Sequence, residues 1–395
     1  MDMRSLETAP FDPAGMSAAE RVRRAYSGIL TPDRMAQTLR QGDKLFATRA
    51  VPAGPQAALL PHRPVDFDGL YFASNGRGVD LYDYLAVNRV AGLIIIQDGA
   101  VALETYQLGN HAGSRWLSMS MAKSISTTLV GAALRDGLIA SLDDNITRYV
   151  TALRGSAYDG VPVRDVLQMT SGVFFHEDYG DPASDRRRML EAQIAQVPGA
   201  ILAHLASLPK AGPPGSIFNY STGETHVVGA LVQAATGRSL SDYLSEKIWR
   251  PCGMEQDGAW WLEAPGGLEV AGSGLSACLR DFARFGLFML DDGVVEGRRV
   301  LPEGWVAEAT RPRTLGGGQR LDYGFMWWPQ PGPDGAFTDG AYRAGGIFGQ
   351  YIYVNPARRL VIAVNSARSK PKGAEAISDL DFFNAVAAAF AKGDR

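Results

Sequence analysis

Strand-like runs near the two chain ends, separated by helical patterns, constrain the fold of this 395-residue chain more than any other feature. Toward the N-terminal end, Gly92–Gln97 and Val101–Tyr106 are apolar runs joined by Asp98–Gly99, a pair typical of hairpin turns. Toward the C-terminal end, Tyr351–Val354 and Leu360–Val364 are strand-like and enclose a proline-containing turn. We therefore expect one sheet that takes strands from both chain ends, with a helical region inserted.

Residues between these runs show the periodicity of helices. Residues 120–135 contain a single glycine and no proline, and their pattern ends at Asp136–Gly137, as expected for a buried helix closed by a glycine. Further helical patterns cover residues 163–169, 186–196, 226–236, 279–290 and 379–391. The spacing predicts an all-helical domain over residues 116–265.

The fold class that follows is α+β: an antiparallel sheet flanked by helices, with the all-helical domain inserted. Residues 66–115 and 266–395 are predicted to form the sheet domain. Residues 1–65, rich in proline, glycine, alanine and arginine, are predicted to form an arm over a domain, with a helix over Ala18–Leu30 capped by Ser17. A chain of this length can bury about three quarters of its unfolded surface, so core formation is not limiting.

Charge and composition exclude several kinds of partner. The net charge of −3 gives no reason to expect nucleic acid or an anionic membrane. The longest apolar runs, such as Ala91–Ile96, are far shorter than the roughly 20 residues that span a bilayer. Residues 1–15 carry acidic and proline residues where a secretory signal has a cationic start and an apolar stretch. We expect a cytoplasmic monomer or homodimer whose partner is a small molecule.

Cysteine and histidine do not form the patterns of a disulfide framework or a metal site. Cys252 and Cys278 are the two cysteines, and neither lies in a motif with metal-ligand spacing. None of the five histidines forms an H-x-x-x-H pair, and no G-x-S-x-G elbow precedes a helix. The sequence therefore disfavours a metallohydrolase and a Ser-His-Asp hydrolase, and it predicts no metal and no organic cofactor.

The segment Ser120–Met–Ala–Lys123 has the form S-x-x-K at the start of a predicted helix. At this spacing both side chains share one helical face, so the lysine amine can reach the serine hydroxyl. A serine at a helix N-terminus also offers its own N–H group and the positive end of the helix dipole to a developing oxyanion. The segment can therefore supply a nucleophile, its electrostatic partner and one oxyanion donor. From this string alone, a capping serine followed by a surface lysine stays open.

Tyr220 lies in the segment Phe218–Gly223, which opens the helix that contains His226. A tyrosine has an unperturbed pKa near ~10, so it acts as a base only where a nearby cation holds its phenolate. Lys123 is a candidate for that cation. An ordinary aromatic side chain packed at a helix start is the alternative.

A third segment, Arg343–Gln350, contains several glycines and leads into a predicted strand. Glycine on a strand marks close backbone approach, which a substrate lying along a sheet edge needs, so Gly346 is a candidate for substrate binding. The N–H group of Ile347 would complete an oxyanion hole with that of Ser120. A bulge or a turn is the alternative.

In this order the three segments resemble the signatures of the serine β-lactamase and penicillin-binding-protein superfamily, which are S-x-x-K, a Tyr or Ser motif, and K-T-G. Within it, the chain is similar to the class C-type esterase branch and, in particular, to the 6-aminohexanoate-dimer hydrolases. The similarity runs from about Leu93 to Val364 and includes the stretches Val166–Gly172, Gly274–Gly286, Tyr323–Trp328 and Tyr351–Pro356. It implies a β-lactamase/transpeptidase-like fold.

The segment His176–Ser184 resembles the Asn-Glu-Asp-Tyr-x-Asp-Pro segment of the 6-aminohexanoate-dimer hydrolases. The resemblance implies that Tyr179 lies at the rim of the pocket and contacts substrate, whereas the residues alone also fit a solvated acidic turn. Trp327, Trp328 and Phe348 suggest an apolar rim as well, although aromatic residues also fill cores.

The chain departs from the superfamily pattern at three places. Tyr220–Ser221–Thr222 stands where class C enzymes have Tyr-x-Asn, so the amide that grips a substrate carbonyl is absent. Ala344–Gly345–Gly346 stands in place of Lys-Thr-Gly, without the cation and hydroxyl that hold a β-lactam carboxylate. Thr170 and Ser171 follow Met169, where many relatives have histidine. The first two departures argue against antibiotic hydrolysis and leave the Ser/Lys/Tyr set intact.

The function implied by the resemblance is hydrolysis of a small ester or amide through an acyl-enzyme on Ser120. Lys123 and Tyr220 together would take the serine proton, the N–H groups of Ser120 and Ile347 would hold the oxyanion, and Tyr220 would protonate the leaving group. Two alternatives remain open. One is a β-lactamase or D,D-peptidase/acyltransferase activity, and the other is a non-catalytic binding protein on the same scaffold.

Overall fold

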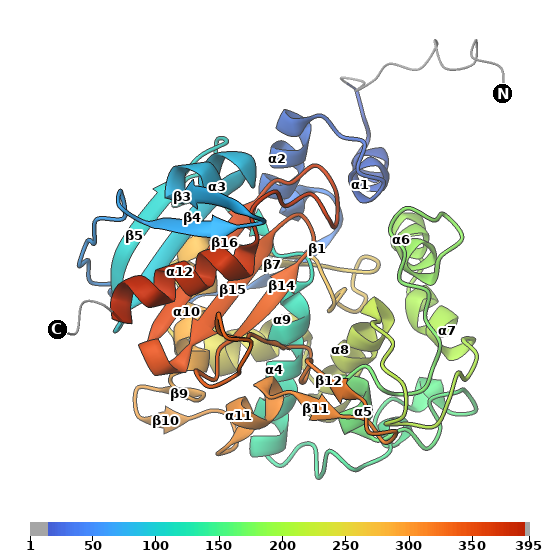
Figure 1. The fold of residues 1–395 in the computed structure, drawn as a ribbon. Coiled ribbons are helices and arrows are strands. Elements are labelled where there is room, and N and C mark those ends of the chain that lie inside the picture. The colour runs from blue at the N-terminus through green and yellow to red at the C-terminus, as the bar shows by residue number, and fades with distance from the viewer. Residues whose placement is uncertain (1–14, 392–395) are drawn as a thin grey trace.

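In the computed structural model, which describes residues 15–391, the two ends of the chain build one sheet, as predicted (Figure 1). Its six strands are antiparallel and lie in the order β13-β14-β15-β16-β4-β5. Their bounds are β4 (Val90–Gln97), β5 (Ala100–Tyr106), β13 (Trp328–Pro329), β14 (Tyr342–Gly346), β15 (Gln350–Asn355) and β16 (Leu360–Ser366). The pairing of β16 with β4 joins the two chain ends, with Ile362 opposite Ile95.

The predicted hairpin turn between β4 and β5 is confirmed. Asp98 and Gly99 have φ angles of +49° and +75°. Positive φ at both central residues matches the twist of the flanking strands and favours aspartate followed by glycine. The sequence therefore encodes this turn locally.

Helices cover both faces of the sheet. On one face α10 (Leu279–Leu290) belongs to the same apolar cluster as Ile94 of β4, and on the other face α12 (Asp379–Ala391) clusters with Leu93. Successive side chains of a strand point to opposite faces, so β4 is buried on both sides. Both helices lie where the sequence predicts them.

The helical region lies beside the sheet domain, and α4 (Met121–Arg135) lies between the two, buried on every face from Met121 to Ala133. Its predicted end is confirmed, since Gly137 follows with a φ of +74°. The other helices of the region are α5 (Val163–Leu167), α6 (Asp185–Ala195), α7 (Ala200–Ala206), α8 (Thr222–Thr236) and α9 (Leu240–Leu244).

The prediction that residues 116–265 are all-helical is wrong at both edges. There β6 (Trp116–Leu117) and β7 (Gly258–Trp261) join β1 (Thr48–Val51) and β8 (Leu275–Ala277) in a second antiparallel sheet of order β1-β7-β8-β6. Strands of two to four residues are too short to show a period in the sequence, and every residue of β6, β7 and β8 is buried.

The N-terminal segment is an arm only in part. Ser17 caps α1 (Ala18–Tyr26) as predicted, but the helix ends before Leu30 because Gly28 adopts a φ of +65°. A second helix, α2 (Pro32–Arg40), begins at a proline, and β1 then pairs with β7. This segment is therefore built into the second sheet.

Short elements complete the fold: β2 (Tyr71–Ser74), β3 (Arg77–Asp80), α3 (Leu81–Val87), β9 (Val294–Val295), β10 (Arg298–Arg299), α11 (Trp305–Thr310), β11 (Arg313–Thr314) and β12 (Arg320–Leu321). The β2–β3 hairpin lies against α12. Within residues 15–391, no helix has both the length and the apolar character needed to cross a membrane.

Candidate active site

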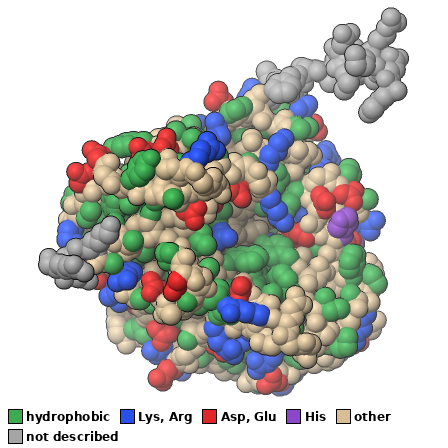
Figure 2. All heavy atoms as spheres, in the orientation of Figure 1, with side chains coloured by type: hydrophobic (Ala, Val, Ile, Leu, Met, Phe, Trp, Pro, Cys, Tyr) green, Lys and Arg blue, Asp and Glu red, His purple; other side chains and the backbone are tan. Residues whose placement is uncertain are grey.

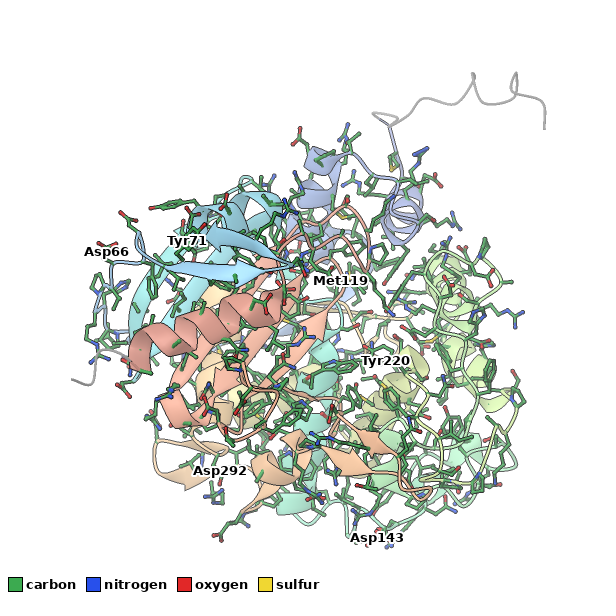
Figure 3. The ribbon with its side chains drawn as sticks, in the orientation of Figure 1. Asp66, Tyr71, Met119, Asp143, Tyr220 and Asp292 are labelled. Atoms are coloured by element: carbon green, nitrogen blue, oxygen red, sulfur yellow. The ribbon has the colours of Figure 1, made fainter. Side chains whose placement is uncertain are left out.

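Ser120 lies directly before α4, where the helical region meets the sheet domain. Figure 3 shows the neighbouring Met119 and Tyr220 at this junction. Met119 has a φ of +46°, a conformation that costs a non-glycine residue on the order of 1 kcal/mol. This turn leads the chain from β6 into α4 and places Ser120 in the lining of a cavity.

Lys123 lies one helical turn beyond Ser120 and is 1% exposed. Its Nζ atom donates hydrogen bonds to Ser120 Oγ at 3.0 Å, to Thr222 Oγ1 at 2.9 Å and to the Gly272 carbonyl at 2.8 Å. Burial lowers the pKa of Lys123 to about 7 because desolvation disfavours the ammonium, while the charge of Glu177 opposes this shift. A neutral amine is therefore available near neutral pH beside the serine hydroxyl.

Tyr220 lies two residues before α8 and faces the same pair. Its ring centroid is 5.5 Å from Lys123 Nζ, and the nearby Ser120 hydroxyl acts to lower the pKa of the Tyr220 phenol. Burial raises the pKa of Tyr220 above its ordinary value, and the Glu177 carboxylate adds to the increase. The phenol is therefore protonated at neutral pH, which does not favour the predicted phenolate and makes Lys123 the better base of the two.

Gly346 ends β14 against the turn that carries Ser120. A Cβ atom at Gly346 would lie 2.6 Å from the Ser118 carbonyl oxygen and 3.0 Å from Ser120 N, so a larger residue would require the backbone to move. The close approach expected from the glycines is thus present, between two backbone segments. Ile347 follows and lines the same cavity as Ser120.

The sequence analysis did not predict two polar residues at the site, Thr222 and Glu177. Thr222 Oγ1, which accepts from Lys123, donates to Glu177 Oε1 at 2.6 Å, and Thr222 N donates to Glu177 Oε2 at 2.8 Å. The Tyr179 hydroxyl also donates to Glu177 Oε1, at 2.9 Å. A signal for both was present, because Thr222 occupies the last position of the Tyr220 motif and Glu177 lies in the acidic segment with Tyr179.

A cavity of about 390 Å³ includes Ser120 in its lining. Figure 2 shows a hollow near the middle of this face, with hydrophobic side chains inside it and Lys and Arg side chains beside it. The lining includes the aromatic residues Tyr179, Tyr220, Trp328 and Tyr351 and the charged residues Arg343, Arg368, Lys372 and Glu375. An apolar cavity with a few converging polar groups is the usual form of a small-molecule site.

Tyr179 and Trp328 line this cavity, where the sequence places them, whereas Trp327 and Phe348 do not. Trp327 is fully buried and stacks on Phe285 of α10. Adjacent residues of an extended segment point to opposite sides, so only one of the two tryptophans reaches the cavity. Phe348 is also fully buried, in the turn between β14 and β15, among residues of the N-terminal segment and β6. The prediction that Trp327 and Phe348 belong to the apolar rim of the pocket is therefore wrong.

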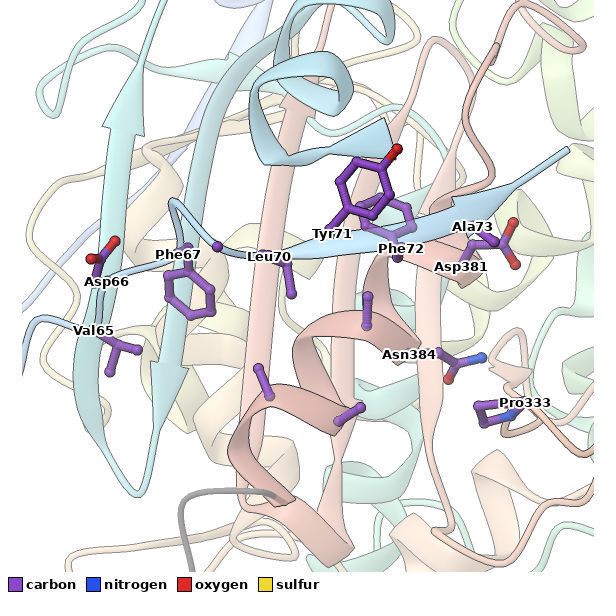
Figure 4. Close-up of a pocket in the computed structure, with 14 residues that line it drawn as sticks. Val65, Asp66, Phe67, Leu70, Tyr71, Phe72, Ala73, Pro333, Asp381 and Asn384 are labelled. Carbon is purple, nitrogen blue, oxygen red and sulfur yellow. The ribbon is translucent and has the colours of Figure 1, made fainter. Parts of the chain in front are cut away.

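A larger hollow of about 720 Å³ lies between residues 65–73 and α12, away from Ser120 (Figure 4). Among the described residues that line it, the ionisable groups are Asp66, Asp381 and Tyr71. It holds neither a serine nor a lysine, so it offers no nucleophile paired with a base. The smaller cavity is the better candidate for chemistry.

Histidine is absent from the described lining of the cavity around Ser120. His226 is buried in α8 with its Nε2 atom 3.7 Å from Glu263, and His62 lines a separate hollow beside β5. Across residues 15–391, no three His, Cys, Asp or Glu side chains are grouped so that they could hold a metal ion. The polar groups gathered at the serine are therefore those of lysine, tyrosine and threonine.

Comparison with known sequences finds relatives among hydrolases. A model of the Beta-lactamase family matches residues 86–383. A 6-aminohexanoate-dimer hydrolase of Paenarthrobacter ureafaciens is 31% identical over 309 residues, which are 74% of this chain and 76% of that protein. A D-aminopeptidase of Brucella anthropi is 44% identical over 43 residues, 11% of this chain and 8% of that protein.

Solved structures share the architecture. A Bacillus anthracis protein provisionally named 6-aminohexanoate-dimer hydrolase has a TM-score of 0.80 at 22% identity, with 91% of this chain and 95% of that chain covered. A family VIII carboxylesterase has a TM-score of 0.56 at 16% identity, with 78% of this chain and 96% of that chain covered. These likenesses show the fold, an antiparallel sheet flanked by helices of the β-lactamase/transpeptidase type.

Proposed function

Because the chain belongs to the Beta-lactamase family, we propose that it is a serine hydrolase that cleaves small esters or amides through an acyl-enzyme on Ser120. The observation that carries this proposal is the 3.0 Å contact between Lys123 Nζ and Ser120 Oγ at the wall of a cavity. An amine with a pKa of about 7 in this position can remove the serine proton near neutral pH.

In the acylation step, the neutral amine of Lys123 takes the proton of Ser120 while Oγ forms a bond to the carbonyl carbon of the substrate. The carbonyl electron pair moves to oxygen and gives a tetrahedral oxyanion. The N–H groups of Ser120 and Ile347 hold this oxyanion, and the N-terminal end of the α4 dipole adds to its stabilisation.

Collapse of the tetrahedral intermediate breaks the bond between the carbonyl carbon and the leaving oxygen or nitrogen. The protonated phenol of Tyr220 donates its proton to that atom, and the proton on the Lys123 ammonium then reaches the Tyr220 phenolate through water in the cavity. A water molecule then gives its proton to the neutral Lys123 and adds to the acyl carbon. The bond from that carbon to Ser120 Oγ then breaks and releases the carboxylic acid, while the Lys123 ammonium gives its proton to Oγ, so the enzyme returns to its starting state.

Small esters and amides are the proposed substrates. The relatives are named as a 6-aminohexanoate-dimer hydrolase, a D-aminopeptidase and a carboxylesterase, and a cavity of about 390 Å³ can hold a small acyl group with its leaving group. The absence of Lys-Thr-Gly from β14 argues against β-lactam antibiotics as substrates.

Hydrolysis of para-nitrophenyl pentanoate tests the role of Ser120. We expect Ser120→Ala to lower kcat/KM on the order of 10³-fold or more, since removal of a nucleophile leaves only binding and the oxyanion hole. The matched control is Ser124→Ala on the same helix, because Ser124 Oγ donates to the Met326 carbonyl at 2.6 Å and does not line the cavity. If Ser120→Ala hydrolyses the ester at the rate of the wild-type protein, Ser120 is not the nucleophile.

Covalent labelling gives a second readout that does not depend on the choice of ester. We expect a fluorophosphonate to add one phosphonyl group to the wild-type protein, with the adduct on the peptide that contains Ser120. Ser120→Ala should stay unlabelled. A wild-type protein that neither forms the adduct nor hydrolyses any ester would instead be a binding protein on this scaffold.

A further inference from the structure

Arg343, on β14, presents its guanidinium group to the cavity that contains Ser120. A Cβ atom at Gly345, its next neighbour on the same face of the strand, would lie 3.2 Å from Arg343 Nη1, so the side chain lies above that glycine. The guanidinium carbon is 4.9 Å from the centroid of the Tyr351 ring. Stacking of this kind orients the group and leaves its N–H edge available for a ligand.

The charge of Arg343 has no counterion among residues 15–391. Its Nε atom is buried without an acceptor, and Arg343 forms no ion pair with any carboxylate of the described chain. Arg368, in the same cavity, also has an unpaired Nε atom, but it does have carboxylate partners, because its Nη2 is 2.5 Å from Asp379 and its Nη1 is 3.7 Å from Glu375. The Arg343 side chain is only partly buried, so its guanidinium can meet a ligand that enters the cavity and carries the negative charge that the described residues do not supply.

Lys372 adds a second positive charge at the outer side of the cavity. Its Nζ atom lies 5.3 Å from the ring centroid of Tyr179 and 5.9 Å from that of Tyr220, and its charge acts on the exposed Asp178 carboxylate without forming an ion pair in the described chain. The ionised side chains that line the cavity are three cations and one carboxylate, Glu375, which faces Arg368. The two remaining positive charges make the cavity attractive to an anion.

We propose that Arg343 and Lys372 form a subsite for a carboxylate group of the substrate. The planar N–H fork of a guanidinium matches the two oxygens of a carboxylate and binds them through charge-assisted hydrogen bonds. The proposal rests on the proposed function and names its substrate class: esters or amides that also carry a free carboxylate. A substrate with an ammonium group at this place is repelled by both cations.

Two pairs of esters test this subsite, each pair differing only in one negative charge. In the first pair the acyl part differs: para-nitrophenyl glutarate, which has a free carboxylate, and its methyl ester. In the second pair the leaving group differs: para-carboxyphenyl pentanoate and its methyl ester. For each pair the ratio of kcat/KM between the charged and the neutral ester is measured, because the chemistry common to both esters cancels in this ratio.

We expect Arg343→Met to lower the charged-to-neutral ratio about tenfold or more in at least one pair, as loss of a charge-assisted hydrogen bond predicts. Methionine keeps an unbranched apolar chain over Tyr351. Arg343→Lys should recover part of the ratio, and Lys372→Met should lower it less. The matched control is Arg298→Met on β10, outside the cavity, which should leave the ratio unchanged.

An unchanged ratio in both pairs for Arg343→Met, or an equal drop for Arg298→Met, would overturn the subsite. Continued turnover of the neutral esters shows that the variant is folded. If wild-type protein hydrolyses none of the esters, the proposed function fails, and the subsite is then tested alone by calorimetric titration of Ser120→Ala with glutarate, where absence of binding overturns the subsite. Binding that is lost in the Ser120→Ala/Arg343→Met double variant supports the subsite, and binding that is retained overturns it.

Discussion

At position 123, a side chain that carries a charge in water lies inside the protein, one helical turn from the candidate nucleophile. Desolvation lowers the pKa of Lys123 to about 7, and Arg186 and Lys372 act in the same direction. The carboxylate of Glu177, which is joined to Lys123 through the hydroxyl of Thr222, opposes the shift. The protonation state of the base therefore depends on burial and on charges that lie far away in the sequence.

The kcat/KM for a neutral ester is expected to fall as the pH drops below about 7, because a protonated Lys123 cannot take the proton of Ser120. The change Glu177→Gln removes a charge that favours the ammonium, so the pKa of Lys123 falls further and the acid limb moves to lower pH. Profiles of kcat/KM against pH for both proteins check this.

The matched control is Asp178→Asn, since Asp178 is the exposed neighbouring carboxylate and accepts only backbone N–H groups, from Gly180 and Asp181. Its acid limb should coincide with that of the wild type. A limb that stays in place or moves to higher pH in Glu177→Gln would contradict the assignment of Lys123 as the titrating base.

At the scale of elements, two glycines set how closely α4 is packed. Gly346 lets the end of β14 touch the backbone before α4, as described above. Gly131, the single glycine inside α4, faces Trp305 of α11, whose indole ring would lie 2.5 Å from a Cβ atom at that position. At these two positions a larger side chain would prevent α4 from packing as closely against β14 and against α11.

Gly346→Ala should lower kcat for a neutral ester about 100-fold or more while the protein stays folded. The new methyl group would meet the Ser118 carbonyl and Ser120 N, so β14 must move away from α4 and carry Ile347 with it, out of the position of an oxyanion donor. Steady-state kinetics and a thermal unfolding curve check this. Gly317→Ala is the control because a Cβ atom there meets nothing within 4 Å. Unchanged kcat in Gly346→Ala would show that this contact does not position the donors.

On the scale of the whole molecule, the N-terminal segment joins the two regions that enclose the cavity. Arg23 of α1 donates to both carboxylate oxygens of Glu191 on α6, at 2.9 and 2.5 Å. Lys370, which follows β16, donates to the Gly28 carbonyl at 2.7 Å. Between these contacts, the Tyr26 ring stacks on Tyr179 with 5.7 Å between centroids. The N-terminal segment therefore packs against Tyr179, which lines the cavity.

Tyr26→Ala is expected to raise KM for a neutral ester roughly threefold to tenfold and to change kcat by less than about twofold. The stacked pair contributes about 0.5–1.5 kcal/mol, and its loss, together with that of the Tyr26 contact to Arg186, frees Tyr179 while the hydrogen bonds of Lys123 to Ser120 and Thr222 stay in place. Kinetics of the variant check this, with Tyr71→Ala as the control, because Tyr71 is an exposed tyrosine of β2 that lines the other hollow. A fall in kcat with unchanged KM would contradict the supporting role.

Much of this protein could be predicted from its sequence because the features concerned depend on neighbours a few residues apart. The Asp98–Gly99 turn, the end of α4 at Gly137 and the bounds of α12 follow from local conformational preference and apolar period. The pairing of Ser120 with Lys123 follows from the pitch of a helix. Membership of the Beta-lactamase family follows from the order of such local motifs.

Only the tertiary structure decided which side chains reach the cavity and which charges remain without a partner. The sequence treats Trp327 and Trp328 alike, but packing buries the first against α10 and leaves the second at the site. Nor does any local pattern connect Glu177 to Lys123, or show that Arg343 has no carboxylate beside it. Burial, pKa and ion pairing depend on residues that folding brings together from distant parts of the chain, and no local period encodes those contacts.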